Sequence, residues 1–293
     1  MNKSLTSNLM TAAPLFFILM WSTGHIVTKL GIPFIEPFRF LAIRFALSAI
    51  FLTILAASFR VSWPSSLHDI FHIIVAGTLI HAAYLGGVFV SIDLGLSAGA
   101  LGVITGIQPI LTAAFSGLIF REKISCQQWF GLILGLIGVA LVVWEKFTLE
   151  QTPIAAFFAA FVCLVAITGG TIYQKKYCTD YNLLSSNAIQ LAVSALLCGA
   201  ITICLERGDI FWGGNLVFAI IWQVLILSVL SFSLFYWLLA RGEAVRVTSL
   251  FYLMAPSTAI MGYIFFGEIF DFAAAVGMVL AILGFWLVFR KSH

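Results

Sequence analysis

Ten long apolar stretches follow one another along this chain, and they constrain its fold more than any other feature of the sequence. Each has about 20 residues, the length of helix that crosses the ~30 Å hydrocarbon core of a bilayer. The stretches are continuously apolar and lack the alternation of barrel strands, so each predicts a transmembrane helix. The predicted spans are residues 12–32, 38–59, 70–92, 96–119, 126–145, 153–173, 184–205, 215–239, 246–267 and 271–289.

The composition excludes a water-soluble protein. Of the 293 residues, 62% are hydrophobic and 9% are charged, whereas about 25% of residues are charged in an ordinary soluble domain. The formal net charge is only +3 and the basic residues are scattered, which argues against a surface for nucleic acid. We therefore expect the helices to lie in a lipid bilayer, with no nucleic acid as a partner.

The positions of Lys and Arg predict which helix ends face the cytoplasm, because cytoplasmic segments retain basic residues. With the N-terminus inside, ten of the 15 basic residues lie on the cytoplasmic side. The other five are Lys29, Arg39, Arg44, Lys146 and Arg207. Both termini are therefore predicted to be cytoplasmic.

The two halves of the chain repeat each other. Equivalent residues are separated by 146 or 147 positions, which is half the chain length. The equivalent pairs include Pro109 and Pro256, Glu122 and Glu268, Gly131 and Gly277, and Gly138 and Gly284. The sequence thus predicts two domains of five helices each, residues 12–145 and 153–289.

The second half is predicted to be inverted relative to the first. Because five is an odd number, the second half enters the membrane from the opposite face. The charges agree, since residues 94–98 carry no Lys or Arg, whereas the turn before the ninth helix has Arg241 and Arg246. Inverted repeats are a common construction of secondary transporters, whose binding site lies near the bilayer midplane between the halves.

Short motifs occur in the same order in both halves. The first half contains Trp21-Ser22-Thr23-Gly24, Lys29-Leu30-Gly31, Pro37-Phe38-Arg39, Arg44-Phe45, Gln108-Pro109, Glu122, Gly131, Gly135 and Gly138. The second half contains Pro256, Gly267-Glu268, Gly277 and Gly284. This doubled order resembles the EamA-type repeat of the drug/metabolite transporter superfamily, from Pro14 to Phe289. The resemblance implies a ten-helix permease of the bacterial inner membrane, often an exporter of amino acids or other small metabolites, with a cavity lined by helices 1, 3, 4, 6, 8 and 9.

Ionisable and aromatic side chains inside the spans are candidates for a substrate site, because such polar groups are costly in hydrocarbon. Trp21, His25 and Lys29 share one face of the first helix. They either bind a substrate carboxylate or anchor the helix at the membrane interface. In the third helix, His81 and Tyr84 either line a polar cavity or pack in the core.

Two helix interruptions at equivalent positions also indicate a binding site, with a packed proline kink as the alternative. Gln108 and Pro109 mark the fourth helix, and Tyr252 and Pro256 mark the ninth. Two aromatic residues, Tyr173 in the sixth helix and Trp237 in the eighth, are weaker candidates for the same cavity.

Other residues are predicted to be structural. Arg44 lies about two turns into the second helix and is expected to pair with Glu36 or a backbone carbonyl, because an unpaired buried charge is costly, with a functional role as the less favoured alternative. Small residues suited to close helix contact occur in the fifth and tenth helices, at Gly131, Gly135, Gly138, Gly277 and Gly284. They predict packing between the halves or between subunits, which leaves a monomer and a homodimer open.

The sequence predicts no catalytic residue, cofactor or metal site. It has no GxxxxGK[ST] segment for ATP, its five Cys form no paired motif, and all 12 acidic residues lie near predicted helix ends. Proton exchange through a mid-membrane carboxylate is therefore not favoured. Coupling through His25 or His81 and simple facilitated diffusion both stay open.

A function from another class would be a membrane-embedded metal-dependent enzyme. His68 and His72 are four residues apart, as in a zinc helix, but Asp69 stands where the HExxH motif has Glu. The favoured prediction is a secondary permease that exports small metabolites such as amino acids by alternating access around a midplane cavity.

Overall fold

The computed structural model describes residues 3–144, 152–266 and 272–290, and within these ranges all regular structure is helical. The first half contains α1 (Lys3–Gly31), η1 (Ile32–Phe34), α2 (Pro37–Ser58), α3 (Leu67–Gly77), η2 (Thr78–Ala83), α4 (Tyr84–Asp93), α5 (Ala98–Thr105), α6 (Gln108–Ile119) and α7 (Cys126–Val142). The second half contains α8 (Ile154–Tyr177), α9 (Leu183–Leu205), α10 (Gly214–Trp222), η4 (Gln223–Ser231), α11 (Phe232–Arg241), α12 (Ala244–Ser249), η5 (Leu250–Leu253), α13 (Met254–Phe266) and α14 (Phe272–Phe289).

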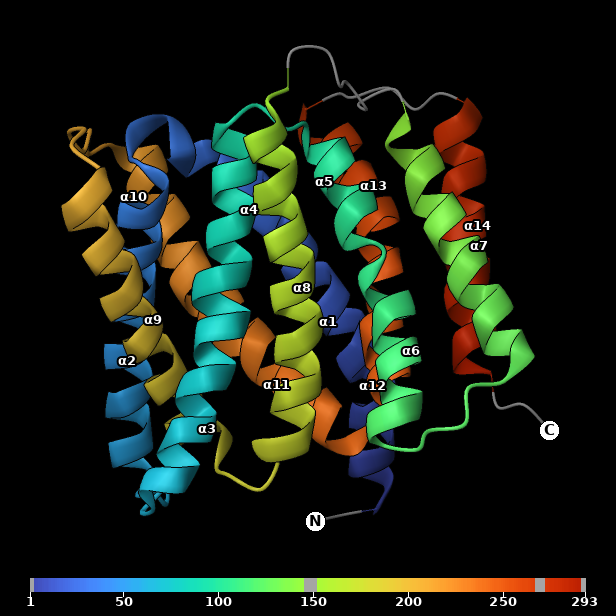
Figure 1. Cartoon of the computed structure of the whole chain (residues 1–293), viewed down its shortest axis with the longest axis horizontal. Coiled ribbons are helices and arrows are strands. Elements are labelled where there is room, and N and C mark those ends of the chain that lie inside the picture. The colour runs from blue at the N-terminus through green and yellow to red at the C-terminus, as the bar shows by residue number, and fades with distance from the viewer. Residues whose placement is uncertain (1–2, 145–151, 267–271, 291–293) are drawn as a thin grey trace.

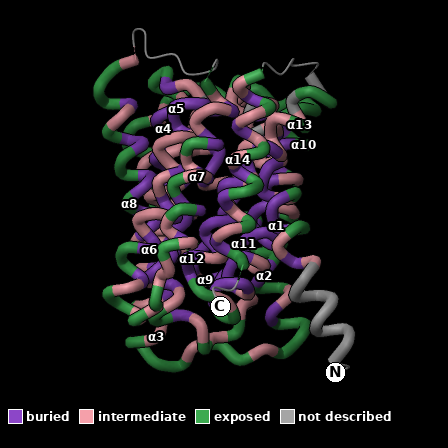
Figure 2. The backbone as a smooth tube through the Cα atoms, turned by 90° about the vertical axis from the view of Figure 1, so that its right-hand side faces the viewer, coloured by how far each residue is buried: buried purple, intermediate pink, exposed green. Residues whose placement is uncertain are grey.

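The helices form one bundle with the dimensions and polarity of a membrane protein. In the described ranges, nine helices are long and apolar enough to cross a bilayer, and α7 adds a shorter apolar helix of 17 residues. Figure 1 shows them side by side along a common direction. Buried residues gather in the interior of the bundle (Figure 2), while large apolar side chains such as Leu118, Ile154 and Leu196 remain 74–88% exposed. Lipid is the environment that such an exterior requires.

The two halves run in opposite directions through this bundle. Helix α1 begins at the lower end in Figure 1, whereas α8, its counterpart in the second half, begins at the upper end. Helix α14 ends at the lower end, where α1 begins. The predicted all-helical fold with two inverted repeats is therefore confirmed.

The repeat extends to the helix boundaries. Three pairs of helices begin 146 positions apart, namely α5 and α12 at Ala98 and Ala244, α6 and α13 at Gln108 and Met254, and α7 and α14 at Cys126 and Phe272. The third helix of each half also contains a π-helical segment, η2 in the first and η4 in the second. Segments of this kind interrupt the regular backbone ladder and often occur at functional sites.

Equivalent helices pack against each other across the two halves. The pairs α2 with α9 and α7 with α14 have the most extensive contacts between elements. A Cβ atom built on Gly131 would lie 2.7 Å from the carbonyl oxygen of Gly284, and one on Gly277 would lie 2.7 Å from that of Gly138. Because Gly131 is equivalent to Gly277 and Gly138 to Gly284, these contacts are exchanged by an approximate two-fold relation. The small residues let the two backbones approach closely within one chain.

Several predicted ends differ from the observed ones. Helix α1 begins at Lys3 instead of residue 12, and α8 continues to Tyr177 instead of ending at residue 173. The extra turn of α8 is stabilised by Gln174, which is buried and accepts a hydrogen bond from Gln190. Hydropathy could not show this extension, because the last turn also carries Lys175 and Lys176.

One end of the bundle is held by an acidic residue that caps α2. The carboxylate of Glu206, just after α9, accepts hydrogen bonds from the backbone N–H groups of Phe38 and Arg39, each at 2.7 Å. The first N–H groups of a helix have no partner within the helix, and they favour a negative charge. This contact joins the N-terminus of α2 to the C-terminus of its repeat partner α9.

Candidate functional site

A chain of buried polar side chains crosses the interior of the bundle. The Tyr236 hydroxyl on α11 lies 2.9 Å from His81 Nε2 on η2 and donates to Gln190 Oε1 on α9 at 2.8 Å. Gln190 Nε2 in turn donates to Gln174 Oε1 on α8 at 3.0 Å. Because the hydroxyl proton is given to Gln190, Tyr236 accepts from His81, which places a proton on Nε2 of the imidazole. The chain joins η2 of the first half to three helices of the second.

Arg44 lies beside this chain and has an unexpected partner. Its Nε atom donates to Ser228 Oγ on η4 at 2.8 Å. Glu36, the partner expected from the sequence, instead accepts from the backbone N–H of Gly208 at 2.9 Å and lies 3.5 Å from Arg39. The expected pair with Glu36 is therefore wrong, because Glu36 precedes α2 at the end of the bundle and Arg44 points into it.

Trp21 lies in an aromatic cluster of the core. Its ring centroid is 4.7 Å from that of Phe232, 5.1 Å from Phe17 and 5.5 Å from Phe251, and the side chain is buried. The cluster packs α1 against α11 and η5. The side chains of His25 and Lys29, predicted to share a face with Trp21, lie outside the described part of the structure.

Tyr84 occupies a central position at the start of α4. It lies close to Trp21 of α1, Arg44 of α2 and Cys163 of α8. Although three other helices surround it, the side chain is only partly buried. Tyr84 and His81 therefore lie in the same region as Arg44.

The two predicted helix interruptions are present. Helix α5 ends at Thr105 and α6 begins at Gln108, with Pro109 in the first turn, where a missing N–H removes no helical hydrogen bond. Gln108 Nε2 donates to Thr171 Oγ1 on α8 at 3.3 Å. In the second half, the 3-10 segment η5 separates α12 from α13 just before the buried Pro256.

The ring of Tyr252 on η5 packs directly against Gly135 of α7. A Cβ atom on Gly135 would collide with the Tyr252 ring. The Tyr252 hydroxyl is buried and has no hydrogen-bond partner among the described residues. The ring therefore packs against α7, whereas the hydroxyl makes no hydrogen bond with a described residue.

Helix α1 is joined to the eighth transmembrane helix by hydrogen bonds that sequence reasoning did not identify. Gln223 Nε2 on η4 donates to Thr28 Oγ1 at 2.7 Å and to the Gly24 carbonyl at 3.3 Å. Trp222 Nε1 donates to Thr23 Oγ1 at 2.9 Å. The available signal was a polar amide within an apolar span, which is costly unless it is paired.

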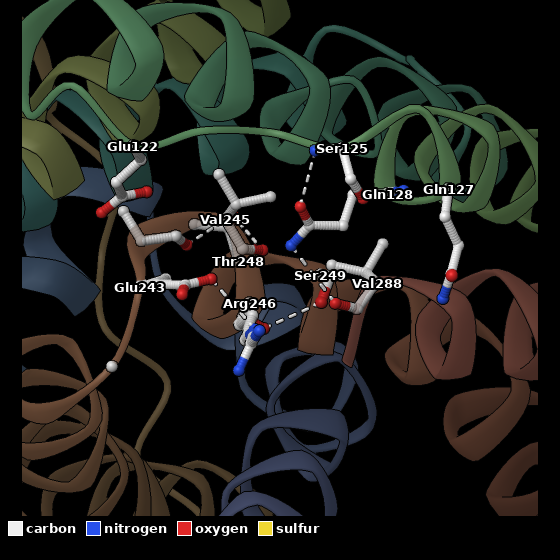
Figure 3. A network of polar contacts seen from close by, with 12 residues as sticks. Glu122, Ser125, Gln127, Gln128, Glu243, Val245, Arg246, Thr248, Ser249 and Val288 are labelled. Carbon is white, nitrogen blue, oxygen red and sulfur yellow. Dashed lines mark hydrogen bonds and ion pairs between the residues drawn. The ribbon is translucent and has the colours of Figure 1, made fainter. Parts of the chain in front are cut away.

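Ion pairs lie at the end of the bundle where α6 and α8 finish. Lys175 Nζ is 2.7 Å from Glu122 Oε1 and donates to the Gly242 carbonyl at 2.9 Å. Both side chains are largely buried, with Lys175 17% and Glu122 14% exposed. In Figure 3, Glu122 and the turn that follows it face α12, where Arg246 Nε lies 3.0 Å from Glu243 Oε2. The pair of Lys175 and Glu122 joins the second half to the first at this end, whereas the pair of Arg246 and Glu243 lies within the second half.

Two other predicted site residues lie near the same end. The Trp237 ring has the guanidinium of Arg241 4.5 Å from its centroid. The Tyr173 hydroxyl is 2.5 Å from His72 Nδ1, and His72 Nε2 is 3.1 Å from His68 Nε2. Neither aromatic side chain belongs to the polar chain around His81.

The His68 and His72 pair gives the metal-enzyme alternative little support. Among the described residues, no group of three or more His, Cys, Asp or Glu side chains could hold a metal ion. His72 is instead held by Tyr173 and by stacking on the Tyr177 ring at a centroid distance of 4.4 Å. The two histidines therefore lie in an aromatic contact between α3 and α8.

Comparisons with known proteins agree with this architecture. The model of the EamA-like transporter family matches residues 10–144 and 154–290. "Uncharacterized transporter YvbV" of Bacillus subtilis (strain 168) is 25% identical, over 94% of this chain and 90% of that protein. "Probable amino-acid metabolite efflux pump" of Salmonella typhimurium is 22% identical, over 93% of this chain and 92% of that protein. A crystal structure with 18% sequence identity shares the fold with a TM-score of 0.82, covering 95% of this chain and 96% of its own.

Proposed function

Because the chain belongs to the EamA-like transporter family, we propose that it is a secondary transporter whose two inverted halves rock around a site between them. The observation that carries this proposal is the buried chain of His81, Tyr236 and Gln190, which joins the first half to the second. Polar side chains are costly inside a bilayer, and they commonly mark the pathway of a solute. Hydrogen bonds that link two halves can also be exchanged as the halves move.

The ion pair between Glu122 and Lys175 supports alternating access. It closes one end of the bundle by joining the turn after α6 to α8. That end also carries Arg241 and Arg246, so the distribution of positive charge favours its placement in the cytoplasm. In this proposal both termini are cytoplasmic, and the pair must open for a solute to enter from the cytoplasm.

The proposed substrates are small amphipathic metabolites, with amino acids first, and the proposed direction is export across the bacterial inner membrane. Two relatives, from Salmonella typhimurium and Escherichia coli, carry the name "Probable amino-acid metabolite efflux pump". The interior offers a cation in Arg44, a neutral hydrogen-bonding group in Asn187, and an aromatic cluster around Trp21. This combination suits a molecule that has both a charged group and an apolar part.

A thermal-shift screen of the purified protein tests the substrate class. Amino acids, nucleobases, polyamines and cationic drugs are added separately, and the melting temperature is measured. A ligand at 100 times its Kd stabilises the folded state by about 2.7 kcal/mol, which raises the melting temperature. A response to amino acids supports the proposal, and a response confined to polyamines or cationic drugs contradicts it.

Transport itself is measured with proteoliposomes loaded with the amino acid that gives the largest shift. We expect its efflux to be faster than from liposomes without protein. Equal rates would contradict transport even if the ligand binds.

A further inference from the structure

Arg44 is a buried cation without a counter-ion. Its side chain is 3% exposed and points from α2 into the membrane-spanning bundle. Among the residues that the structure describes, no carboxylate lies in an ion pair with it, and its hydrogen bond goes to the neutral Ser228 Oγ. A charge held in this way is costly in the interior of a membrane protein.

The terminal nitrogens of Arg44 are available to a ligand. No described residue accepts a hydrogen bond from them, yet they are absent from the fully enclosed polar atoms that lack a partner. They therefore keep some accessible surface. Tyr84, which lies close to Arg44, is also only partly buried. Ser228 and Tyr84 thus place the guanidinium among α2, α4 and η4.

Two buried polar side chains, His81 and Asn187, lie beside Arg44. The His81 imidazole and the Asn187 amide also contact each other. Asn187 binds the Ser228 carbonyl through Nδ2 at 3.2 Å, so it approaches the same segment of η4 as Arg44. Buried polar atoms are normally paired, so the terminal nitrogens of Arg44, which have no acceptor among the described residues, indicate a missing polar ligand.

The repeat shows that the fold itself does not require a charge at this position. The residue equivalent to Arg44, 146 positions later, is Gln190, and Ser48 is equivalent to Ser194 in the same way. Both serines donate to the carbonyl four residues before them, at 2.7 Å and 2.8 Å. The two helices are thus built alike, but Gln190 is neutral and its amide is paired.

We propose that Arg44 binds the carboxylate of the transported substrate. This inference rests on the proposed function and adds a specific recognition residue to it. Guanidinium and carboxylate groups form two parallel hydrogen bonds, and such a pair supplies the missing counter-charge. Transport requires that this partner be supplied by the solute, because a permanent protein carboxylate would compete with it.

The first test is the stability of the empty protein. Arg44→Gln removes the charge and introduces the residue that α9 already holds at the equivalent position. Without ligand, its melting temperature is expected to be about 2–4 °C above that of the wild type, because an unpaired buried charge is lost. Arg60→Gln, at an exposed position two residues after the end of α2, is the matched control and should have the melting temperature of the wild type. A melting temperature of Arg44→Gln clearly below that of the wild type would show a structural role and overturn the inference.

The second test compares carboxylates with their amides. The probes are L-leucine, L-phenylalanine and L-threonine and the three corresponding carboxamides, with sodium chloride at equal ionic strength as a further arm. The acids should raise the melting temperature of the wild type and of Arg60→Gln. The shift of the melting temperature with each amide should be at least about tenfold smaller than with the corresponding acid. Arg44→Gln should lose the preference for the acids, and Arg44→Lys should recover part of it.

The outcomes separate the two proposals. An acid preference that persists in Arg44→Gln overturns the role of Arg44 and leaves amino-acid transport standing. A wild-type protein that responds to neither acids nor amides, in screen or in efflux, overturns amino-acid transport. Stabilisation by chloride alone shows a site for an inorganic anion and overturns the assignment to a substrate carboxylate.

Discussion

The carboxylate of Glu122 in the first half and the ammonium of Lys175 in the second half form a largely buried ion pair of 2.7 Å. The Lys175 Nζ atom also lies 5.2 Å from the centroid of the Phe120 ring and donates to the Gly242 carbonyl. One lysine thus joins the end of α6, the end of α8 and the turn between α11 and α12. Any motion that separates the two halves at this end must break these contacts.

We expect loss of this pair to destabilise the closed end. Glu122→Gln or Lys175→Gln should lower the free energy of unfolding by about 1–2 kcal/mol, because the remaining charge stays partly buried without its partner. The double variant should be less affected than the sum of the two single variants, which chemical or thermal unfolding in detergent would measure.

The control for this prediction is Glu243→Gln. Glu243 pairs with Arg246 three residues later, but it is 46% exposed, so its removal should change stability by less than about 0.5 kcal/mol. Additive effects of the two single Glu122 and Lys175 changes would show that the pair contributes nothing.

The contact between α7 and α14 should tolerate no added methyl group. In Gly138→Ala, the new Cβ would collide with the backbone of Ala281, and we expect a loss of about 1–3 kcal/mol or failure to fold. Gly169→Ala on α8 is the control, because no described atom beyond the neighbouring turn of α8 lies within 4 Å of its Cβ position. That change should stabilise the helix by up to about 1 kcal/mol. Melting temperatures of the two purified variants decide this, and a similar effect of both would argue against close packing.

The hydroxyl groups of two buried tyrosines, Tyr236 and Tyr252, should differ in their contribution to the stability of the folded protein. Tyr236→Phe leaves His81 Nε2 and Gln190 Oε1 without a partner and should cost about 1–3 kcal/mol. Tyr252→Phe removes a hydroxyl that has no partner among the described residues, so its stability should equal that of the wild type.

The same two variants separate packing from substrate binding at Tyr252. If the hydroxyl faces the solute, Tyr252→Phe should reduce efflux while the melting temperature of the empty protein stays unchanged. A large loss of stability in Tyr252→Phe would show that the hydroxyl has a protein partner instead.

Native cysteines allow a test of the orientation. Cys126 and Cys204 are exposed, at the start of α7 and near the end of α9, which are opposite ends of the bundle in Figure 1. In single-cysteine variants in intact cells, a membrane-impermeant maleimide should label Cys204 and should label Cys126 only after permeabilisation. The reverse pattern would place the termini outside.

Cys178 provides the negative control for this labelling. Burial raises the pKa of its thiol to about 12, whereas an ordinary thiol has a pKa of about 8.5. Since the thiolate is the reacting species, Cys178 should remain unlabelled at pH 8, from either side. Its reaction should increase as the pH approaches the raised pKa, provided that the fold persists.

Much of the fold could be predicted from local patterns, because the length of an apolar run decides whether it can span a bilayer. The exceptions are instructive. The break between α5 and α6 was expected from Pro109, whereas the π-helical segments η2 and η4 have no comparable signal in the sequence. The candidate site was predicted less well, since Gln190 and Tyr236 are separated by 46 positions and meet only through helix packing.

The sequence by itself determined the number and approximate position of the helices, the doubling of the unit and its inversion, because hydrophobic length, charge bias and repeated motifs are properties of the chain in order. Tertiary structure decided which polar groups meet. Arg44 donates a hydrogen bond to Ser228, which is 184 positions away in the sequence, and Lys175 pairs with Glu122, which is 53 positions away. Such partners depend on how each helix is rotated and how deeply it sits among its neighbours, and that arrangement results from the packing of all the helices together.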